Sequence, residues 1–184
     1  MSIQITEEVQ RRLSFPSLQK IDPNTESKDQ EIHEMIFPLT QAAIMTALAG
    51  LYKITRTTEG SVRLLLTGKS TGWLNEVYGE NLQSTYEQVA LYTHSSINEV
   101  QKLVKQVADT SILILHEQLA GNISAESFTN FMSSQRDNIL AYLPAGLHLG
   151  ELLHDPSIDD NTNKMEGPVS SLMHKIENIF SEGK

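Results

Sequence analysis

The stretch PLTQAAIMTALAGLYKI, residues 38–54, decides the fold. It is rich in alanine, and Lys53 is its only charged residue. A helix that is apolar on most of its faces lies in the centre of a bundle, because no face is polar enough to meet water. Pro38 suits a first helical turn, where its missing amide hydrogen would have no partner. We therefore predict a buried central helix over residues 38–54.

The segments around this helix also repeat their apolar residues with helical period, and strand-like alternation is nearly absent. The longest helix is expected over about residues 97–119, after a capping box of Ser96 and Glu99. Because many of the other helices are short and end at proline or glycine, a regular four-helix bundle is disfavoured. We predict an all-α, irregular multihelical globular domain of about eight to ten short helices around the alanine-rich or the long helix.

Several shorter helices complete this prediction. They are expected over residues 3–13, 27–36, 59–66 and 145–154, around Gly79, and from Ser124 to Tyr142 with a new start at the serine pair 133–134. Gly121 stands where a C-cap glycine would end the longest helix. Pro144 should stop one helix and begin the next, and Gly146 should permit close packing.

Composition excludes several classes of protein. The chain has 184 residues, a formal net charge of −9 and no cysteine. The missing cysteine excludes disulfides, a thiol nucleophile and thiolate metal sites. The acidic balance argues against a nucleic-acid partner, which requires a basic surface. The sequence begins without a signal peptide pattern and has no apolar run of membrane-spanning length, so we expect a cytoplasmic protein with no membrane span.

The charge is spread unevenly and suggests four regions. Formal charges sum to −3 over residues 1–34, −2 over residues 35–150 and −4 over residues 151–184. We predict an N-terminal helix and loop at 1–31, a helical domain at 32–154, an acidic linker at 155–168 and a C-terminal amphipathic helix within 169–184. The apolar stripe of that last helix, which could dock on its own domain or on a partner, is Val169, Leu172, Met173, Ile176 and Phe180.

One group of residues is a candidate metal site. His148, Glu151 and His154 recur every three residues, and Glu151-x-x-His154 matches half of a di-iron motif of helical bundles. The chain contains no second Glu-x-x-His pair, and steps of three residues drift by about 60° each around a helix. We therefore favour surface histidines over metal ligands, and we expect no cofactor.

No catalytic motif occurs in the structural context that it requires. Residues 64–71, LLLTGKST, resemble the end of a phosphate-binding loop, but Arg63 stands where the first glycine is required. The letters of the nucleophile elbow G-x-S-x-G occur at residues 68–72, GKSTG, but the residues before them have a helical pattern, whereas an elbow follows a strand. The zinc motif H-E-x-x-H is missing from the sequence. We expect a protein that is not an enzyme, although residues distant in sequence could still assemble a site in the fold.

One stretch resembles a known family. Residues 134–147, SQRDNILAYLPAGL, are similar to the closing signature of the YidB-like bacterial proteins of unknown function, with the pattern L-P-x-G-L at 143–147. The resemblance covers about residues 32–153 and includes Phe37-Pro38, Glu59-Gly60, Gly68, Gly121, Ser124 and Phe128. The chain departs from the family in its fewer glycines and in the bulky run 112–116. The resemblance implies an all-helical fold and transfers no catalytic residue.

These observations lead to three functional hypotheses. The first is a non-enzymatic module for protein–protein interaction or structure, with a protein partner or a second copy of the chain. The alternative is a helical protein that binds a small ligand or a metal, through His148, Glu151 and His154 or through a pocket beside the alanine-rich helix. An enzyme is the third, and it requires histidine and carboxylate side chains gathered in a cleft.

Overall fold

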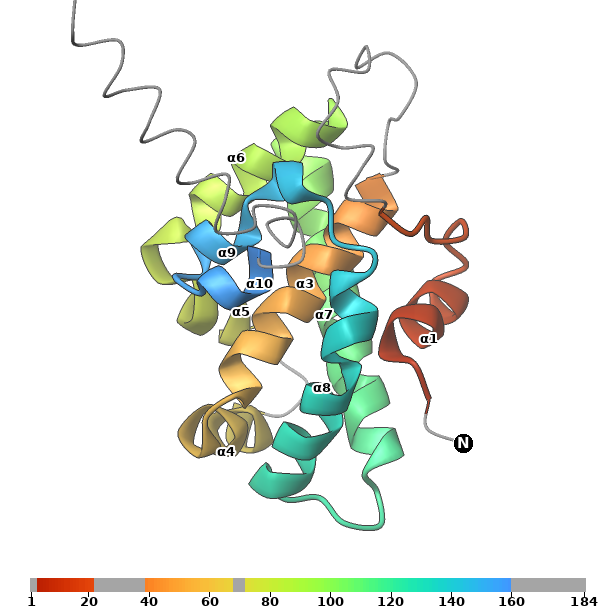
Figure 1. Cartoon of the computed structure of the whole chain (residues 1–184), viewed down its shortest axis with the longest axis vertical. Helices are drawn as coiled ribbons and strands as arrows, with labels where there is room; N and C mark the ends of the chain where they lie inside the picture. Colours follow the sequence, from red (N-terminus) through yellow and green to blue (C-terminus); the bar gives the residue numbers. More distant parts are fainter. Residues whose placement is uncertain (1–2, 22–38, 68–71, 160–184) are drawn as a thin grey trace, which may run out of the picture.

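The computed structural model describes residues 3–21, 39–67 and 72–159, and these residues form an all-α multihelical domain without strands (Figure 1). Its helices and 3₁₀ turns are α1 (Ile5–Arg12), α3 (Leu39–Thr55), α4 (Thr58–Thr67), α5 (Gly72–Tyr78), η1 (Gly79–Asn81), α6 (Leu82–Thr93), α7 (Ile97–Gln118), α8 (Ala125–Leu140), η2 (Ala145–Leu147), α9 (Leu149–Leu152) and α10 (Pro156–Asp159). The predicted fold class is confirmed. The predicted helices at 27–36 and 169–180, and most of the glycine-containing turn after Thr67, lie outside the described residues.

Helix α3 is the predicted central helix. Every residue from Gln41 to Tyr52 is buried, because neighbouring helices cover all sides of this alanine-rich segment. Its main neighbours are α7 and α8, which run alongside it in the middle of the molecule (Figure 1). Polar residues on α3 satisfy their hydroxyl groups within the helix, as Thr46 does by donating to the carbonyl of Ala42 at 2.8 Å. Of the two predicted alternatives, the alanine-rich helix is the buried centre, and α7 packs along it with one buried face.

Helix α7 begins as predicted. The Ser96 hydroxyl accepts from the backbone N–H of Glu99 at 3.3 Å, and the Glu99 carboxylate accepts from the backbone N–H of Ser96 at 3.1 Å. The helix ends at Gln118, in agreement with the predicted end at about 119, but its C-cap residue is Leu119. Gly121 has no left-handed backbone angle and does not cap the helix.

Helix α8 is continuous, so the predicted new start at the serine pair 133–134 is wrong. Its buried residues Phe128, Met132 and Ile139 continue one stripe past the serines. Packing of that stripe holds the helix together where local propensity is weak. Ser134 stays within the helix by donating to the carbonyl of Phe131 at 2.6 Å.

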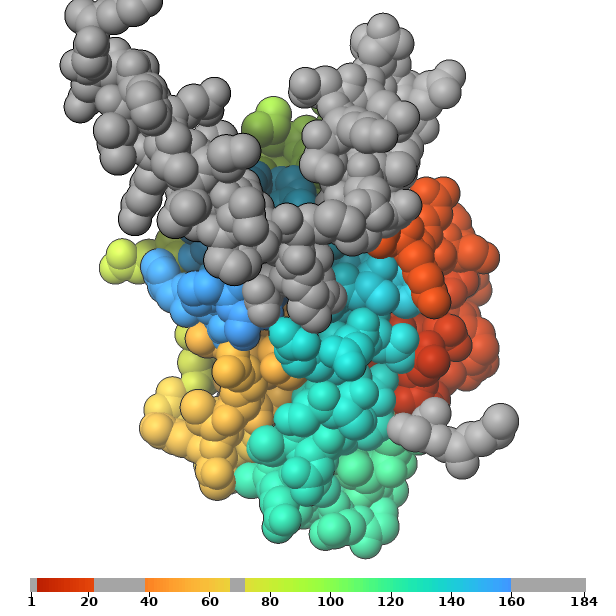
Figure 2. All heavy atoms as spheres, in the orientation of Figure 1, coloured from red at the N-terminus to blue at the C-terminus, as the bar shows by residue number. Residues whose placement is uncertain are grey.

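Helix α1 is part of the domain. Ile5 and Val9 are fully buried, and the backbone N–H of Ile5 donates to the buried side-chain oxygen of Gln135 at 3.0 Å. Glu8 accepts hydrogen bonds from Arg11 and Arg12, which lower the pKa of its carboxyl to about 2. In Figure 2 the red atoms of this segment lie against the side of the molecule. The predicted helix at 3–13 is confirmed and packs on α7.

The corner formed by η2, α9 and α10 corrects two predictions. Residues 145–154 are not one helix, because His148 has φ of +49° and separates η2 from α9. Residues 155–159 do not belong to a linker, since α10 packs on α9 and Ile158 is 1% exposed. Their acidic composition suggested solvent, but the buried Asp155 carboxylate is paired with Arg56 and Lys53 of the α3 end. The rest of the predicted linker, residues 160–168, lies outside the described residues.

Candidate functional site

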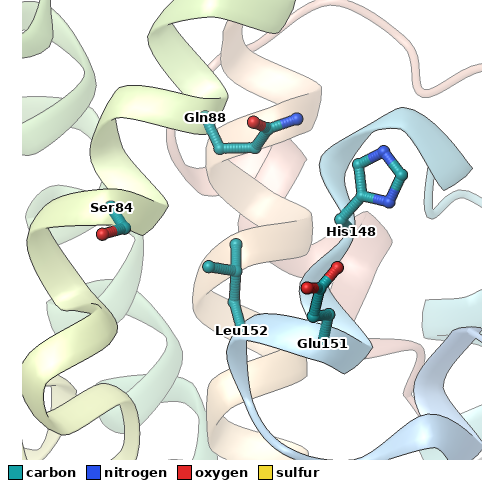
Figure 3. Close-up of a pocket in the computed structure, with 5 residues that line it drawn as sticks. All are labelled: Ser84, Gln88, His148, Glu151 and Leu152. Atoms are coloured by element: carbon teal, nitrogen blue, oxygen red, sulfur yellow. The ribbon is translucent and has the colours of Figure 1, made fainter.

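A hollow of about 280 Å³ lies between α6 and the α9 corner. Five residues line this α6–α9 pocket: Ser84, Gln88, His148, Glu151 and Leu152. Figure 3 shows Ser84 and Gln88 on the α6 side, His148 and Glu151 on the opposite side, and Leu152 between them. Four of the five side chains are polar, so the pocket can recognise a polar group above a small apolar floor.

The α6 wall follows from helical spacing. Ser84 and Gln88 are four residues apart and share one face of the helix. Gln88 is fixed in place because its Nε2 donates to the carbonyl of Gly146 at 2.8 Å. A Cβ at Gly146 would lie 2.6 Å from Cε2 of Tyr92, so only glycine lets η2 approach α6 this closely. The close packing predicted at Gly146 is confirmed.

The opposite wall depends on contacts from α10. The Asp159 carboxylate accepts from the backbone N–H groups of Gly150 at 2.9 Å and Glu151 at 3.1 Å. These amide groups belong to the first turn of α9, where they have no partner within the helix. A Cβ at Gly150 would lie 2.3 Å from an Asp159 oxygen, whereas one at Gly121 would meet no atom within 4 Å. Asp159 therefore sets the start of α9 and the position of Glu151.

The structure does not gather His148, Glu151 and His154 into a metal site. His148 precedes α9 and His154 follows it, with φ of +49° and +51°, so the three do not share one helical face. The His154 ring lies 3.2 Å from the Asn81 amide nitrogen and does not line the pocket. Among the described residues, no three His, Asp or Glu side chains are placed to hold a metal ion.

Two histidines with a left-handed backbone conformation stand where helices end. His94 and His154 follow the last residues of α6 and α9, where a helix often ends on a residue with positive φ. Glycine is the usual residue there, and histidine is among the side chains that tolerate this conformation better than most. These histidines terminate helices, which is a structural reason for their presence.

Ser84, His148 and Glu151 are residue types that could form a nucleophile, a base and an orienting acid. Within residues 3–21, 39–67 and 72–159, however, no hydrogen bond or ion pair joins the three side chains. A nucleophile is activated through a hydrogen bond to its base. The three side chains therefore do not form a hydrogen-bonded triad in this structure.

The pocket walls carry negative charge. Between Gly72 and Gln101 the chain has four glutamates and no lysine or arginine, and residues 137–159 also contain no lysine or arginine. Glu151 is exposed, and in the part of the chain that the structure describes its carboxylate makes no hydrogen bond or ion pair. The sum of −2 over residues 35–150 does not reveal the negative charge around the pocket, because the region of α3 and α4 is net positive and offsets it.

Leu91 extends the α6 wall. It is 72% exposed and follows Gln88 by three residues and Ser84 by seven, which places it on the same helix face as both. Sequence reasoning identified His148 and Glu151 but missed Ser84, Gln88 and Leu91. The spacing of these three along α6 was visible, but only the fold shows that η2 and α9 lie opposite them.

Comparison with known proteins adds no assignment: the chain matches no family model, no curated protein and no solved structure. In the described part of the chain, no helix has the length and hydropathy needed to cross a membrane.

Proposed function

We propose that this chain is a non-enzymatic protein-interaction module, and that the α6–α9 pocket with Leu91 beside it forms its contact surface. The observation that carries the proposal is Leu91, a leucine that is 72% exposed on the helix face that lines the pocket. Exposed leucines occur singly on many proteins. Here one stands next to a pocket, and anchor side chains of interfaces fill such pockets.

The size of the pocket supports a protein partner over a free ligand. Sites for small molecules and cofactors enclose about 300–1,000 Å³ and bury most of the ligand. The α6–α9 pocket holds about 280 Å³, just below this range, and all five of its lining residues are partly buried or exposed, so a small molecule would stay largely open to water. It suits one side chain of a larger partner.

The proposal includes the partner, the location and the alternative function that the sequence suggested. The partner is another protein or a second copy of the chain, in the cytoplasm, with no role for nucleic acid. The YidB-like resemblance supports a helical bacterial protein and names no partner. A small-ligand or metal-binding role is the alternative, and metal analysis of the purified chain before contact with any chelator distinguishes it.

Site-specific photo-crosslinking tests the proposal. A photoreactive amino acid at Leu91 of the full chain should give a discrete adduct, either with a second copy in purified protein or with another protein in cells. The same group at Lys105, which is exposed on α7, is the matched control.

Competition with unlabelled chain tests whether the Leu91 adduct is specific. Excess wild-type chain should suppress the Leu91 adduct, whereas the Leu91→Glu chain should not, because a charge opposes burial of that position in an apolar contact. The proposal is wrong if position 91 yields no more adduct than position 105, or if both competitors act equally.

A further inference from the structure

Building on the proposed function, we propose that the α6–α9 pocket accepts the arginine side chain of a partner protein, and that an apolar residue next to this arginine rests on Leu91. The chemistry of the five lining residues carries this step. This chemistry indicates which kind of partner side chain the pocket can bind.

The pocket offers more hydrogen-bond acceptors than donors. Gln88 uses one N–H of its Nε2 to donate to the Gly146 carbonyl, and no described group donates to its Oε1. The Glu151 carboxylate accepts only, and no described side chain donates to it. These two acceptors have no donor among the described residues, and the Ser84 hydroxyl and His148 ring can accept as well as donate, so the lining suits a ligand that donates from several N–H groups.

The charge of the lining favours a cationic group as the ligand of the pocket. Among the described residues, Glu151 is the only acidic one in the lining, and none of the lining residues is a lysine or arginine. A cationic group entering the pocket would gain a charge-assisted hydrogen bond with Glu151 and meet no lysine or arginine within the lining. An anionic group would be repelled by the same carboxylate.

Shape favours arginine over lysine. A guanidinium presents five N–H donors in a plane and can reach two separate acceptors, whereas an ammonium is a compact point charge. Gln88 lies on α6 and Glu151 on α9, so the two side chains stand on opposite walls of the pocket (Figure 3). The stem of an arginine can lie along Leu152, the only apolar residue of the lining.

Leu91 supplies the apolar part of the contact. It lies about one helical turn beyond Gln88, so an apolar residue adjacent to the arginine can cover it. Glu87, between Gln88 and Tyr86 in the sequence, is also exposed and adds negative charge near this edge. The expected partner segment is therefore basic and apolar in neighbouring positions.

A peptide titration followed by amide NMR tests this inference on the full chain. The probe is acetyl-Leu-Arg-amide, and the control peptide replaces arginine by citrulline, which has nearly the same shape and no charge. We expect the arginine peptide to shift the amide signals of Gln88, Gly146 and Glu151 and to bind about fivefold more tightly than the citrulline peptide, since exposed ion pairs are weak.

Two variants test whether the preference for the arginine peptide depends on Glu151. Glu151→Gln should abolish the preference for arginine, because it removes the charge and keeps the shape. Glu126→Gln removes an exposed glutamate of α8, outside the pocket, and should keep the preference. The amide spectrum of each variant also reports whether the chain is folded.

The two proposals fail separately. The arginine inference is overturned if both peptides bind equally, if the arginine peptide leaves the pocket signals unshifted, or if Glu151→Gln keeps the preference. Crosslinking at Leu91 together with any of these results leaves the interaction surface standing and removes only the arginine anchor. Absence of a specific Leu91 adduct overturns the proposed function itself.

Discussion

Helix α3 and the α9–α10 corner are held in place by different forces. From Gln41 to Tyr52 α3 has no exposed residue, and its contacts are almost entirely apolar. The corner consists of two four-residue helices, and α10 has a single buried apolar side chain, Ile158. Leu149 and Leu153 of the corner are buried as well, and carboxylates add contacts that this stretch of α3 does not have: Asp155 pairs with Arg56 and Lys53, and Asp159 binds the amides that begin α9.

This difference explains which part of the fold could be predicted. Burial of apolar surface is non-directional and leaves a periodic pattern in the sequence. A short helix cannot form by itself, because one turn gains few hydrogen bonds for the backbone freedom that it loses. The corner therefore depends on individual polar contacts with residues far away in the chain, and these contacts also position one wall of the α6–α9 pocket.

The largest effect is expected in α3. Leu48 is fully buried, and Leu48→Ala should lower the free energy of unfolding by about 3 kcal/mol, since it removes apolar contacts and leaves a cavity. Urea denaturation measures the change. Leu66→Ala in α4, where the side chain is 81% exposed, is the control and should stay within about 0.5 kcal/mol of wild type. Equal effects at the two leucines would contradict the assignment of α3 as the core.

A smaller effect is expected at the corner. Asp155→Asn keeps the shape of the side chain and removes its charge, so it should cost about 1–2 kcal/mol, limited by partial exposure of the two cations. Asp137→Asn is the control, because the Asp137 side chain is 94% exposed and its ion pair with Arg136 lies at the surface. Hydrogen exchange of Gly150 and Ile158 should increase more than that of the α3 amides.

The same pair predicts a pH dependence. Burial raises the pKa of the Asp155 carboxyl, but hydrogen bonds from Ser157 and Arg56 and the charge of Lys53 outweigh this and lower it below its ordinary value of 3.8. A group with a lowered pKa stabilises the fold above its ordinary pKa, and the contribution is lost as the pH falls through the folded value. The stability difference between wild type and Asp155→Asn should therefore shrink below about pH 4. A difference that stays constant to low pH would mean that charge is not what holds the corner.

The smallest effect is expected at His148. Its φ of +49° suits glycine, so His148→Gly should stabilise the chain by about 0.5 kcal/mol, which is the relief of strain reduced by the greater freedom of glycine in the unfolded chain. His148→Val should destabilise it by about 1 kcal/mol, because a β-branched residue fits this conformation poorly. Urea midpoints give both values. If the glycine variant is the less stable of the two, the imidazole holds the corner and the conformational explanation is wrong.

Sequence reasoning reached part of the candidate site. It identified His148 and Glu151 by residue type, and the structure places both in the pocket. It grouped them with His154 because it assumed one continuous helix through residues 145–154, and the left-handed angle of His148 breaks that helix. Nothing local distinguishes a histidine that ends a helix from one that continues it, since the choice depends on how the next segment packs.

The sequence by itself determined the all-α class, the buried alanine-rich helix and the capping box that begins α7, because apolar periodicity and cap chemistry act between residues close in the chain. Tertiary structure alone decided that α8 runs unbroken through its serines, that Asp155 to Asp159 belong to the domain, and that α6 faces α9 across a pocket. These features rest on contacts between distant residues, such as Asp155 with Arg56 and Gln88 with Gly146. Their energies depend on the approach of whole helices, which no local pattern records.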